Sequence, residues 1–165
     1  MASSPTEMII QKSRGNYRGF TLVEILIGLA IIGILAAISI PGFISYRYKA
    51  KIAVAITEIK MIEKAITNHE IDDGDLPDSL IEIDMEQITD PWGNPYQYLR
   101  LDGGKTPGIK GKRRRDKNAN PVNSDFDLYS MGRDGKTTAQ FTAKPARDDI
   151  VRANDGAYYG LAGDH

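Results

Sequence analysis

One stretch of this sequence limits its fold more than any other. Residues 22–44 read LVEILIGLAIIGILAAISIPGFI, 23 residues in which Glu24 is the only charge. At about 1.5 Å per residue, such a helix crosses a hydrocarbon core of roughly 30 Å. A buried core helix is the alternative, but the rest of the chain has no other stretch apolar enough to surround it. The segment is also longer than the apolar part of a cleaved secretory signal, about 7 to 15 residues. We therefore predict a retained membrane helix.

The flanking charges do not orient this span. Basic residues lie on both sides of it: Lys12, Arg14 and Arg18 before it, and Arg47, Lys49 and Lys51 after it. The positive-inside rule therefore favours neither direction.

Composition argues against several functions. The chain has 165 residues, enough for one globular domain, and its net charge of −1 gives no field to hold nucleic acid. It has no Cys and two His, so the usual groups for nucleophilic or zinc-dependent catalysis are scarce. We expect neither an enzyme nor a nucleic-acid-binding protein.

The start of the apolar stretch carries a specific motif. The segment GFTLVEILIGLAIIGILAAISIP, residues 19–41, resembles the N-terminal segment of type IV pilins and type II secretion pseudopilins. The resemblance implies that a prepilin peptidase cuts between Gly19 and Phe20 and methylates the new amino terminus. It also implies that residues 1–19 face the cytoplasm, and that the apolar helix is first a membrane anchor and then the spine of a filament.

The residues of this motif suit those roles chemically. Gly19 has no side chain, so its backbone can enter a protease site in an extended form. Glu24 lies about one helical turn from the new amine of Phe20, in apolar surroundings where an unpaired carboxylate is costly. It needs a positive partner, which could be its own amino terminus or that of a neighbouring subunit. The resemblance implies the neighbour, with the pair setting the axial register. A Glu that merely reaches the membrane surface is the alternative.

Beyond the span the helix is expected to change character. Pro41 removes a backbone donor and Gly42 adds freedom, so we predict a kink or a melted stretch near residues 39–42. An apolar stripe at spacings of three and four then carries the helix to about His69 and must be covered. Its members are Ile52, Ile56, Ile59, Ile62 and Ile66.

The rest of the chain reads as a small α+β head. The polar cluster at residues 72–77 ends the helix. Ser79 and Glu82 have capping-box spacing and favour a short helix, although the alternation of residues 81, 83 and 85 also fits a strand. Residues 96–101 alternate like a strand, with Tyr96, Tyr98 and Arg100 on one face. A glycine-rich hairpin is expected next.

Two patches of the head carry a narrower resemblance. TDPWGNPYQYL and, later, FDLYSMGRDG are similar to the major pseudopilin of type II secretion systems. The resemblance implies a calcium site made by Asp134, the carbonyl of Met131, and either Asp148 or Asp149. Because the segment KTTAQFTAKPARD between these acids is longer than in the family, the closing residue stays open. Solvated aspartates in an ordinary turn are the alternative.

Between the patches lies a basic run. It contains Lys110, Lys112, Arg113, Arg114, Arg115 and Lys117, offset by Asp116. Such a run is usually a solvated loop, and docking of an acidic partner is the second interpretation.

Together these observations predict four segments. They are a cytoplasmic leader (1–19), the membrane and spine half of the helix (20–44), its amphipathic half (45–71), and a periplasmic head (72–165) with a small antiparallel sheet and a loop-rich C-terminus. The implied function is that of a structural subunit of a type II secretion pseudopilus in the bacterial inner membrane and periplasm. The implied partners are other copies of the chain, the prepilin peptidase, the secretion assembly platform and minor pseudopilins. A type IV pilin of a surface filament and a monomeric membrane-anchored binding protein are the alternatives.

Overall fold

The computed structural model describes residues 19–101 and 109–165, apart from the side chain of Lys110. Its main element is helix α1, Leu22–Asp73, 52 residues long. The helix passes through Pro41 and Gly42, so the predicted melted stretch is wrong, and a bend there stays a prediction. The chain divides after Phe43 into two compact units.

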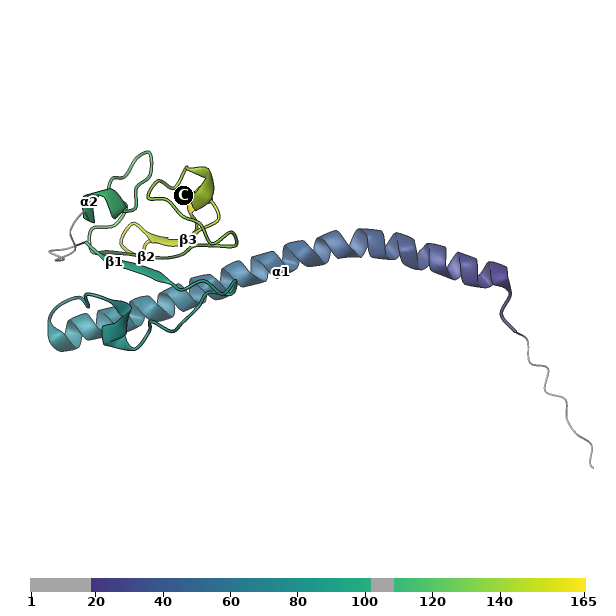
Figure 1. The fold of residues 1–165 in the computed structure, drawn as a ribbon, viewed down its shortest axis with the longest axis horizontal. Helices are drawn as coiled ribbons and strands as arrows, with labels where there is room; N and C mark the ends of the chain where they lie inside the picture. Colours follow the sequence, from purple (N-terminus) through teal and green to yellow (C-terminus); the bar gives the residue numbers. More distant parts are fainter. Residues whose placement is uncertain (1–18, 102–108) are drawn as a thin grey trace, which may run out of the picture. The chain divides into compact units, whose positions relative to one another are not determined.

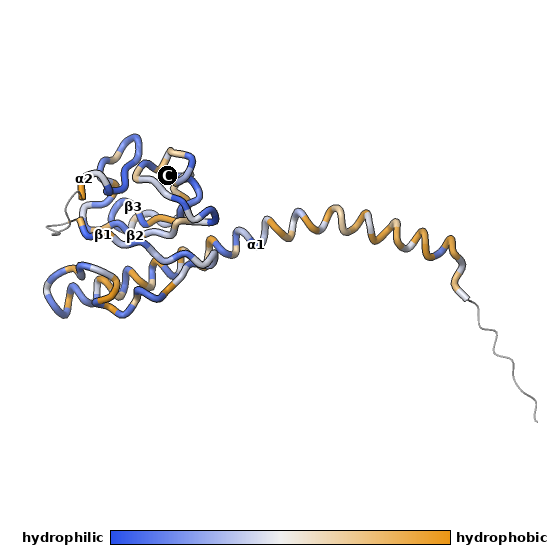
Figure 2. Tube along the Cα trace, viewed as in Figure 1, coloured by the Kyte–Doolittle hydropathy of each residue, from blue (hydrophilic) through white to orange (hydrophobic). Residues whose placement is uncertain are grey.

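The first unit contains the apolar part of α1. Figure 2 shows it as an almost continuous hydrophobic segment. In the described part of the chain, α1 is the one helix long and apolar enough to cross a membrane, and none of its apolar window is buried. Leu22 is 76% exposed and Ile38 is 73% exposed. Side chains this apolar need a covering, and the described residues of the chain do not supply one.

The second unit contains a four-stranded antiparallel sheet (Figure 1). Its strands lie in chain order, and they are β1 (Gln97–Arg100), β2 (Phe126–Ser130), β3 (Ile150–Ala153) and β4 (Tyr158–Leu161). The short helices are η1 (Leu80–Ile83), α2 (Ile109–Lys112), η2 (Lys144–Ala146) and η3 (Ala162–Asp164). A helix, a sheet and connecting loops confirm the α+β prediction.

The amphipathic half of α1 packs on one face of this sheet. Ile59, Ile62 and Ile66 are fully buried, in one cluster with Leu128 and Ile150 from the strands. Ile52 and Ile56 pack at its border. The predicted apolar stripe is therefore the core of the head.

The opposite face of the sheet has a second, smaller core. Phe141 is fully buried there, and Val151 and Ala153 join it from β3. Because side chains alternate along a strand, Ile150 enters the first core and Val151 the second. This explains why all four residues of β3 are buried.

A buried arginine joins α1 to the sheet. Arg152 of β3 is 4% exposed, and its Nε donates to Glu63 of α1 at 2.6 Å. The same guanidinium donates to both carboxylate oxygens of Asp125 at 2.8 and 2.6 Å. Tyr159 of β4 also donates to Glu63. The network links the helix to β3, β4 and the segment before β2.

The end of α1 confirms one prediction and corrects another. The helix ends at Asp73, and Gly74 has φ +80°, a left-handed conformation that suits glycine. Ser79 makes no capping hydrogen bond, so the predicted capping box is wrong. Glu82 instead accepts the amide of Asp78 at 3.0 Å, and the following turn is a 3₁₀ helix.

The predicted strand at residues 96–101 is confirmed by β1. The three side chains predicted on one face contact α1 and the loop that follows it. The Tyr96 hydroxyl, just before β1, donates to Glu58 of α1 at 2.5 Å. Tyr98 donates to the Pro77 carbonyl at 2.7 Å, and Arg100 pairs with Asp75. The glycine-rich hairpin expected next falls largely on residues 102–108, outside the described residues.

Candidate functional site

The predicted processing junction, residues 19 and 20, is an exposed, non-helical segment that precedes α1. Gly19 and Phe20 are both exposed, and the helix begins two residues after Phe20. The Phe20 side chain is 83% exposed. Apart from its chain neighbours, no atom of the described residues lies within 4 Å of the place where a Cβ on Gly19 would stand. A protease could therefore bind this segment in an extended form without unfolding the helix.

Glu24 caps the first turn of α1. Its Oε2 accepts the Thr21 amide and the Thr21 hydroxyl, both at 2.8 Å. The Thr21 hydroxyl oxygen in turn accepts the Glu24 amide at 3.2 Å. This reciprocal pair is a capping box, which satisfies backbone donors that an α-helix leaves open at its start.

The sequence analysis missed this capping box, although its signal was present. Thr21-x-x-Glu24 has the required spacing and stands directly before an apolar run. The finding gives Glu24 a role inside one chain, since the carboxylate is hydrogen-bonded by its own helix. It supplies no positive partner, because the described contacts of this carboxylate are all with Thr21.

The loop after β2 brings two of the predicted calcium ligands together. Oδ2 of Asp148 accepts the amides of Arg133 at 3.0 Å and Asp134 at 3.1 Å. Oδ1 of Asp134 accepts the Lys136 amide at 2.8 Å, which closes a tight turn. Each carboxylate thus keeps a second oxygen that accepts no hydrogen bond from the described residues.

Gly132 allows this close approach. It has φ +63°, and a Cβ there would collide with the Asp148 backbone carbonyl. Its amide donates to the Ser130 hydroxyl at 3.0 Å, while its carbonyl accepts the Asn94 side-chain amide at 2.9 Å. The TDPWGN patch and the SMGRDG patch, which were recognised separately in the sequence, therefore meet here.

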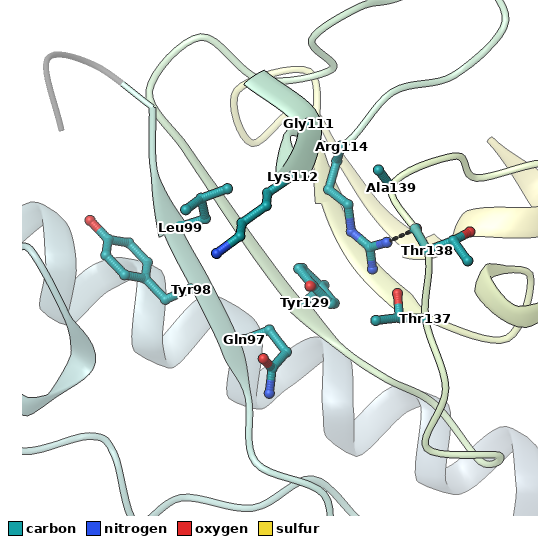
Figure 3. A pocket seen from close by; sticks show the side chains of 10 residues that line it. All are labelled: Gln97, Tyr98, Leu99, Gly111, Lys112, Arg114, Tyr129, Thr137, Thr138 and Ala139. Carbon is teal, nitrogen blue, oxygen red and sulfur yellow. Dashed lines mark hydrogen bonds between the residues drawn. The ribbon is translucent and has the colours of Figure 1, made fainter. Parts of the chain in front are cut away.

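Asp149 points elsewhere. Its carboxylate is fully buried, and its Oδ2 accepts the Arg114 guanidinium at 2.5 Å and the Thr137 hydroxyl at 2.5 Å. The guanidinium also donates to the Thr138 carbonyl (Figure 3). Residues 148 and 149 are neighbours in sequence, but only Asp148 faces the Asp134 loop.

Other aspartates of the C-terminal half are engaged within the head. Asp127 is buried and accepts the Arg114 amide at 2.8 Å and the Asn123 side chain at 2.9 Å. Asp155 accepts the amide and hydroxyl of Ser124. Among residues 19–101 and 109–165, three or more His, Cys, Asp or Glu side chains nowhere gather as a metal site would require.

The basic run belongs partly to the core. Arg114 is 2% exposed, and its guanidinium lies 3.5 Å from the centre of the Tyr129 ring. Arg115 donates to the Gln140 side chain at 3.2 Å and Arg113 to the Leu101 carbonyl at 3.3 Å. Neither the solvated-loop nor the docking interpretation describes these three arginines, which hold segments of the head together.

The fold is that of the type IV pilin-like class. It combines a long apolar helix, an exposed segment before that helix and a small antiparallel sheet. Residues 14–40 match the family described as the prokaryotic N-terminal methylation motif.

Comparison with known proteins narrows the class. The chain is 35% identical over 144 residues to the type II secretion system core protein G of Pseudomonas aeruginosa, covering 74% of this chain and 88% of that one. The core protein G of Vibrio cholerae is 28% identical, with 79% and 90% covered. A fimbrial protein of Neisseria meningitidis is 27% identical, with 84% and 80% covered. The chain belongs to the family of type II secretion system core protein G. No solved structure matches it significantly.

Proposed function

We propose that this chain is the repeating structural subunit of a type II secretion pseudopilus. One observation carries the proposal: the apolar window of α1 is entirely unburied within the chain and follows a prepilin-type junction. Such a surface is stable in a bilayer before assembly, and against other copies of the same helix afterwards. A structural rather than catalytic role follows, since the relatives are named as secretion core proteins and fimbrial proteins.

A subunit of a surface pilus is the second candidate, favoured by the match to the Neisseria fimbrial protein. Deleting the gene in the native host separates the two. We expect exported enzymes to accumulate in the periplasm while surface filaments stay unchanged. Loss of surface filaments with normal secretion would favour the pilin.

Maturation is the first prediction. We propose that a prepilin peptidase in the inner membrane removes residues 1–19 and methylates Phe20, with the head on the periplasmic side. Intact mass of the assembled protein should therefore equal residues 20–165 plus one methyl group. Gly19→Val should retain the leader, because the branched side chain fills the space that glycine leaves open where the protease approaches the backbone closely.

Gly28→Ala provides the matched control. Gly28 lies inside the apolar helix with open space around it, so an added methyl group should leave processing normal. Assembled protein that keeps its leader, or that begins at another residue, would contradict the maturation proposal.

We also propose that the Asp134 loop binds calcium. Support comes from the hydrogen bond of the Asp134 amide to Asp148, and from the second carboxylate oxygen of each residue, which accepts no hydrogen bond from the described residues. Met131, whose carbonyl is the third proposed ligand, belongs to the same loop. Calcium accepts six to eight oxygen ligands, and water would complete the set. Asp149 is left out of the proposal because its carboxylate pairs with Arg114.

Calcium should raise the melting temperature of the detergent-solubilised full chain, and a chelator should lower it, because an ion that binds only the folded state stabilises it. Asp134→Asn should remove the response. Asp84→Asn is the control, since Asp84 is exposed and lies outside this loop. Identical melting curves with chelator and with calcium would leave the loop as an ordinary turn.

A further inference from the structure

A second feature of the head lies where α1 enters it. A pocket of about 230 Å³ is formed by Ile44, Arg47, Tyr48 and Lys51 of α1, by Trp92 of the loop before β1, and by Arg133 of the loop after β2. Half of its lining residues are cations and two are aromatic. Neither the maturation nor the assembly role uses this pocket.

The aromatic wall is held in place by the chain. Asp90 is 3% exposed, and its Oδ1 accepts the amides of Trp92 and Asn94, both at 2.9 Å. The Trp92 and Tyr48 rings are tilted, with centroids 6.1 Å apart. Because the buried carboxylate fixes the turn, Trp92 is presented toward α1 before any ligand arrives.

The cations come from two separate parts of the chain. Lys51 donates to the Pro91 carbonyl at 2.7 Å, and its Nζ lies 5.7 Å from the centre of the Trp92 ring. An ammonium group has three donors, so donors remain for a ligand. Arg133 is exposed and lines the pocket from the loop after β2.

Two carboxylates, Asp148 and Asp164, act on Tyr48 beside these cations. Asp148 is near Tyr48, but its Oδ2 already accepts two backbone amides. Burial raises the pKa of Tyr48, Asp148 raises it further, and Arg133 lowers it. The phenol therefore keeps its proton at neutral pH and remains a hydrogen-bond donor. Three basic side chains and a phenol line the pocket, whereas neither Asp148 nor Asp164 is among its lining residues, so the pocket presents a surface for an anion.

The sequence places this pocket beside the membrane surface. Arg47, Tyr48 and Lys51 follow Ile44, the last residue of the apolar segment, by three, four and seven positions. At 1.5 Å per residue they begin roughly 5 to 10 Å beyond the hydrocarbon, which is the depth of the headgroups. Tyr and Trp prefer this layer, and basic side chains there attract anionic lipids.

We propose that this pocket binds the phosphate headgroup of an anionic phospholipid, with Arg133 and Lys51 at the phosphate and Trp92 against the glycerol. The proposal rests on the membrane anchoring proposed above. Its consequence is that the subunit waiting in the bilayer holds a lipid at the base of its head. That lipid must be released when the subunit leaves the membrane.

The test uses the full chain in phospholipid nanodiscs and the fluorescence of Trp92, the single tryptophan of the sequence. Two sets of phosphatidylcholine discs are compared. One contains phosphatidylglycerol spin-labelled near the carbonyl end of its acyl chain, and the other contains the same mole fraction of phosphatidylcholine labelled at the same place. We expect several-fold stronger quenching by the labelled phosphatidylglycerol, because each nearby cation enriches anionic lipid. Arg133→Gln should reduce this preference, whereas Lys136→Gln, an exposed lysine of the same loop outside the pocket, should preserve it.

Equal quenching by the two lipids in the original chain would overturn the proposal, as would an unchanged preference in Arg133→Gln. Inorganic phosphate is added in a separate arm, and if it abolishes the preference at millimolar concentration, the pocket binds free phosphate and the lipid assignment is wrong. Co-purification of the chain with the discs reports anchoring independently. Failure of the anchor is therefore distinguishable from failure of the pocket.

Discussion

Replacing Glu24 by Val should abolish filament formation while membrane insertion and cleavage continue. The carboxylate is the only charge in the apolar segment, so its removal makes the helix more apolar and favours insertion. Within the described chain it is satisfied by Thr21 alone. A charge at the bilayer centre costs about 2.5 to 3.5 kcal/mol, and less near the end of the span where Glu24 lies. Pairing with the amine of a neighbouring Phe20 would recover part of that cost at every subunit contact. We expect assembly to fall by roughly two orders of magnitude, measured as filaments released from lysed cells and counted by electron microscopy.

The capping box requires a control, because Glu24→Val also removes a helix cap. Thr21→Ala removes the hydroxyl that shares in the box, at a cost of about 1 kcal/mol, and leaves the charge. Glu24→Gln keeps an oxygen that can accept the Thr21 amide and removes the charge. If pairing drives assembly, Thr21→Ala still builds filaments and Glu24→Gln does not. The opposite result would assign the effect to the cap, and normal filaments from Glu24→Val would refute pairing.

The features predictable from the sequence are those that repeat along one element. The apolar segment and the isoleucine stripe depend on helical periodicity alone, and Ile59, Ile62 and Ile66 are buried as that period requires. Strand β1 was predictable for the same reason, because alternation placed Tyr98 and Arg100 on one face.

The features that failed depend on which partner a side chain finds. Thr21 and Ser79 both have capping-box spacing, and of these two Thr21 alone forms the box. Glu82 reaches the Asp78 amide instead, because the chain there turns as a 3₁₀ helix. Spacing identifies the donors and acceptors within reach of each other, and the path of the backbone selects among them.

Arg114 shows the same limit more strongly. In the sequence it is one of six basic residues in a short run, and nothing local distinguishes it from its neighbours. In the fold its guanidinium lies by the rings of Tyr129 and Phe141 and donates to Asp149. Asp149 is 35 residues further along the chain. It also lines a surface pocket of about 410 Å³ beside β1 and β2, from which its guanidinium turns toward Thr138 (Figure 3). Long-range pairs of this kind leave no periodic trace in a sequence.

Replacing Arg114 by Met should destabilise the head by about 3 to 5 kcal/mol at pH 7, because removing one partner leaves the buried Asp149 charge uncompensated. Met keeps much of the apolar volume against Tyr129, so the loss reports mainly on the ion pair. Denaturant unfolding of the full chain in detergent, followed by Trp92 fluorescence, measures it. Arg115→Met is the matched control, since Arg115 is only partly buried and donates to a neutral amide, and it should cost less than about 1 kcal/mol.

The pH dependence of this variant identifies the cause of the loss. Burial raises the pKa of Asp149 to about 6, while the Thr137 hydroxyl and the Arg114 charge oppose that rise. Without Arg114 the pKa of Asp149 moves higher still, whereas in the unfolded chain it returns to its ordinary value. The folded variant therefore binds a proton that the unfolded chain does not, and its stability increases as the pH falls from 7 toward 5. A loss that is the same at both pH values would mean that packing, and not the buried charge, explains the effect of Arg114→Met. The double variant Arg114→Met with Asp149→Leu is a second test. If the buried charge is the cause, this variant should recover most of the stability that Arg114→Met loses, and otherwise it should not.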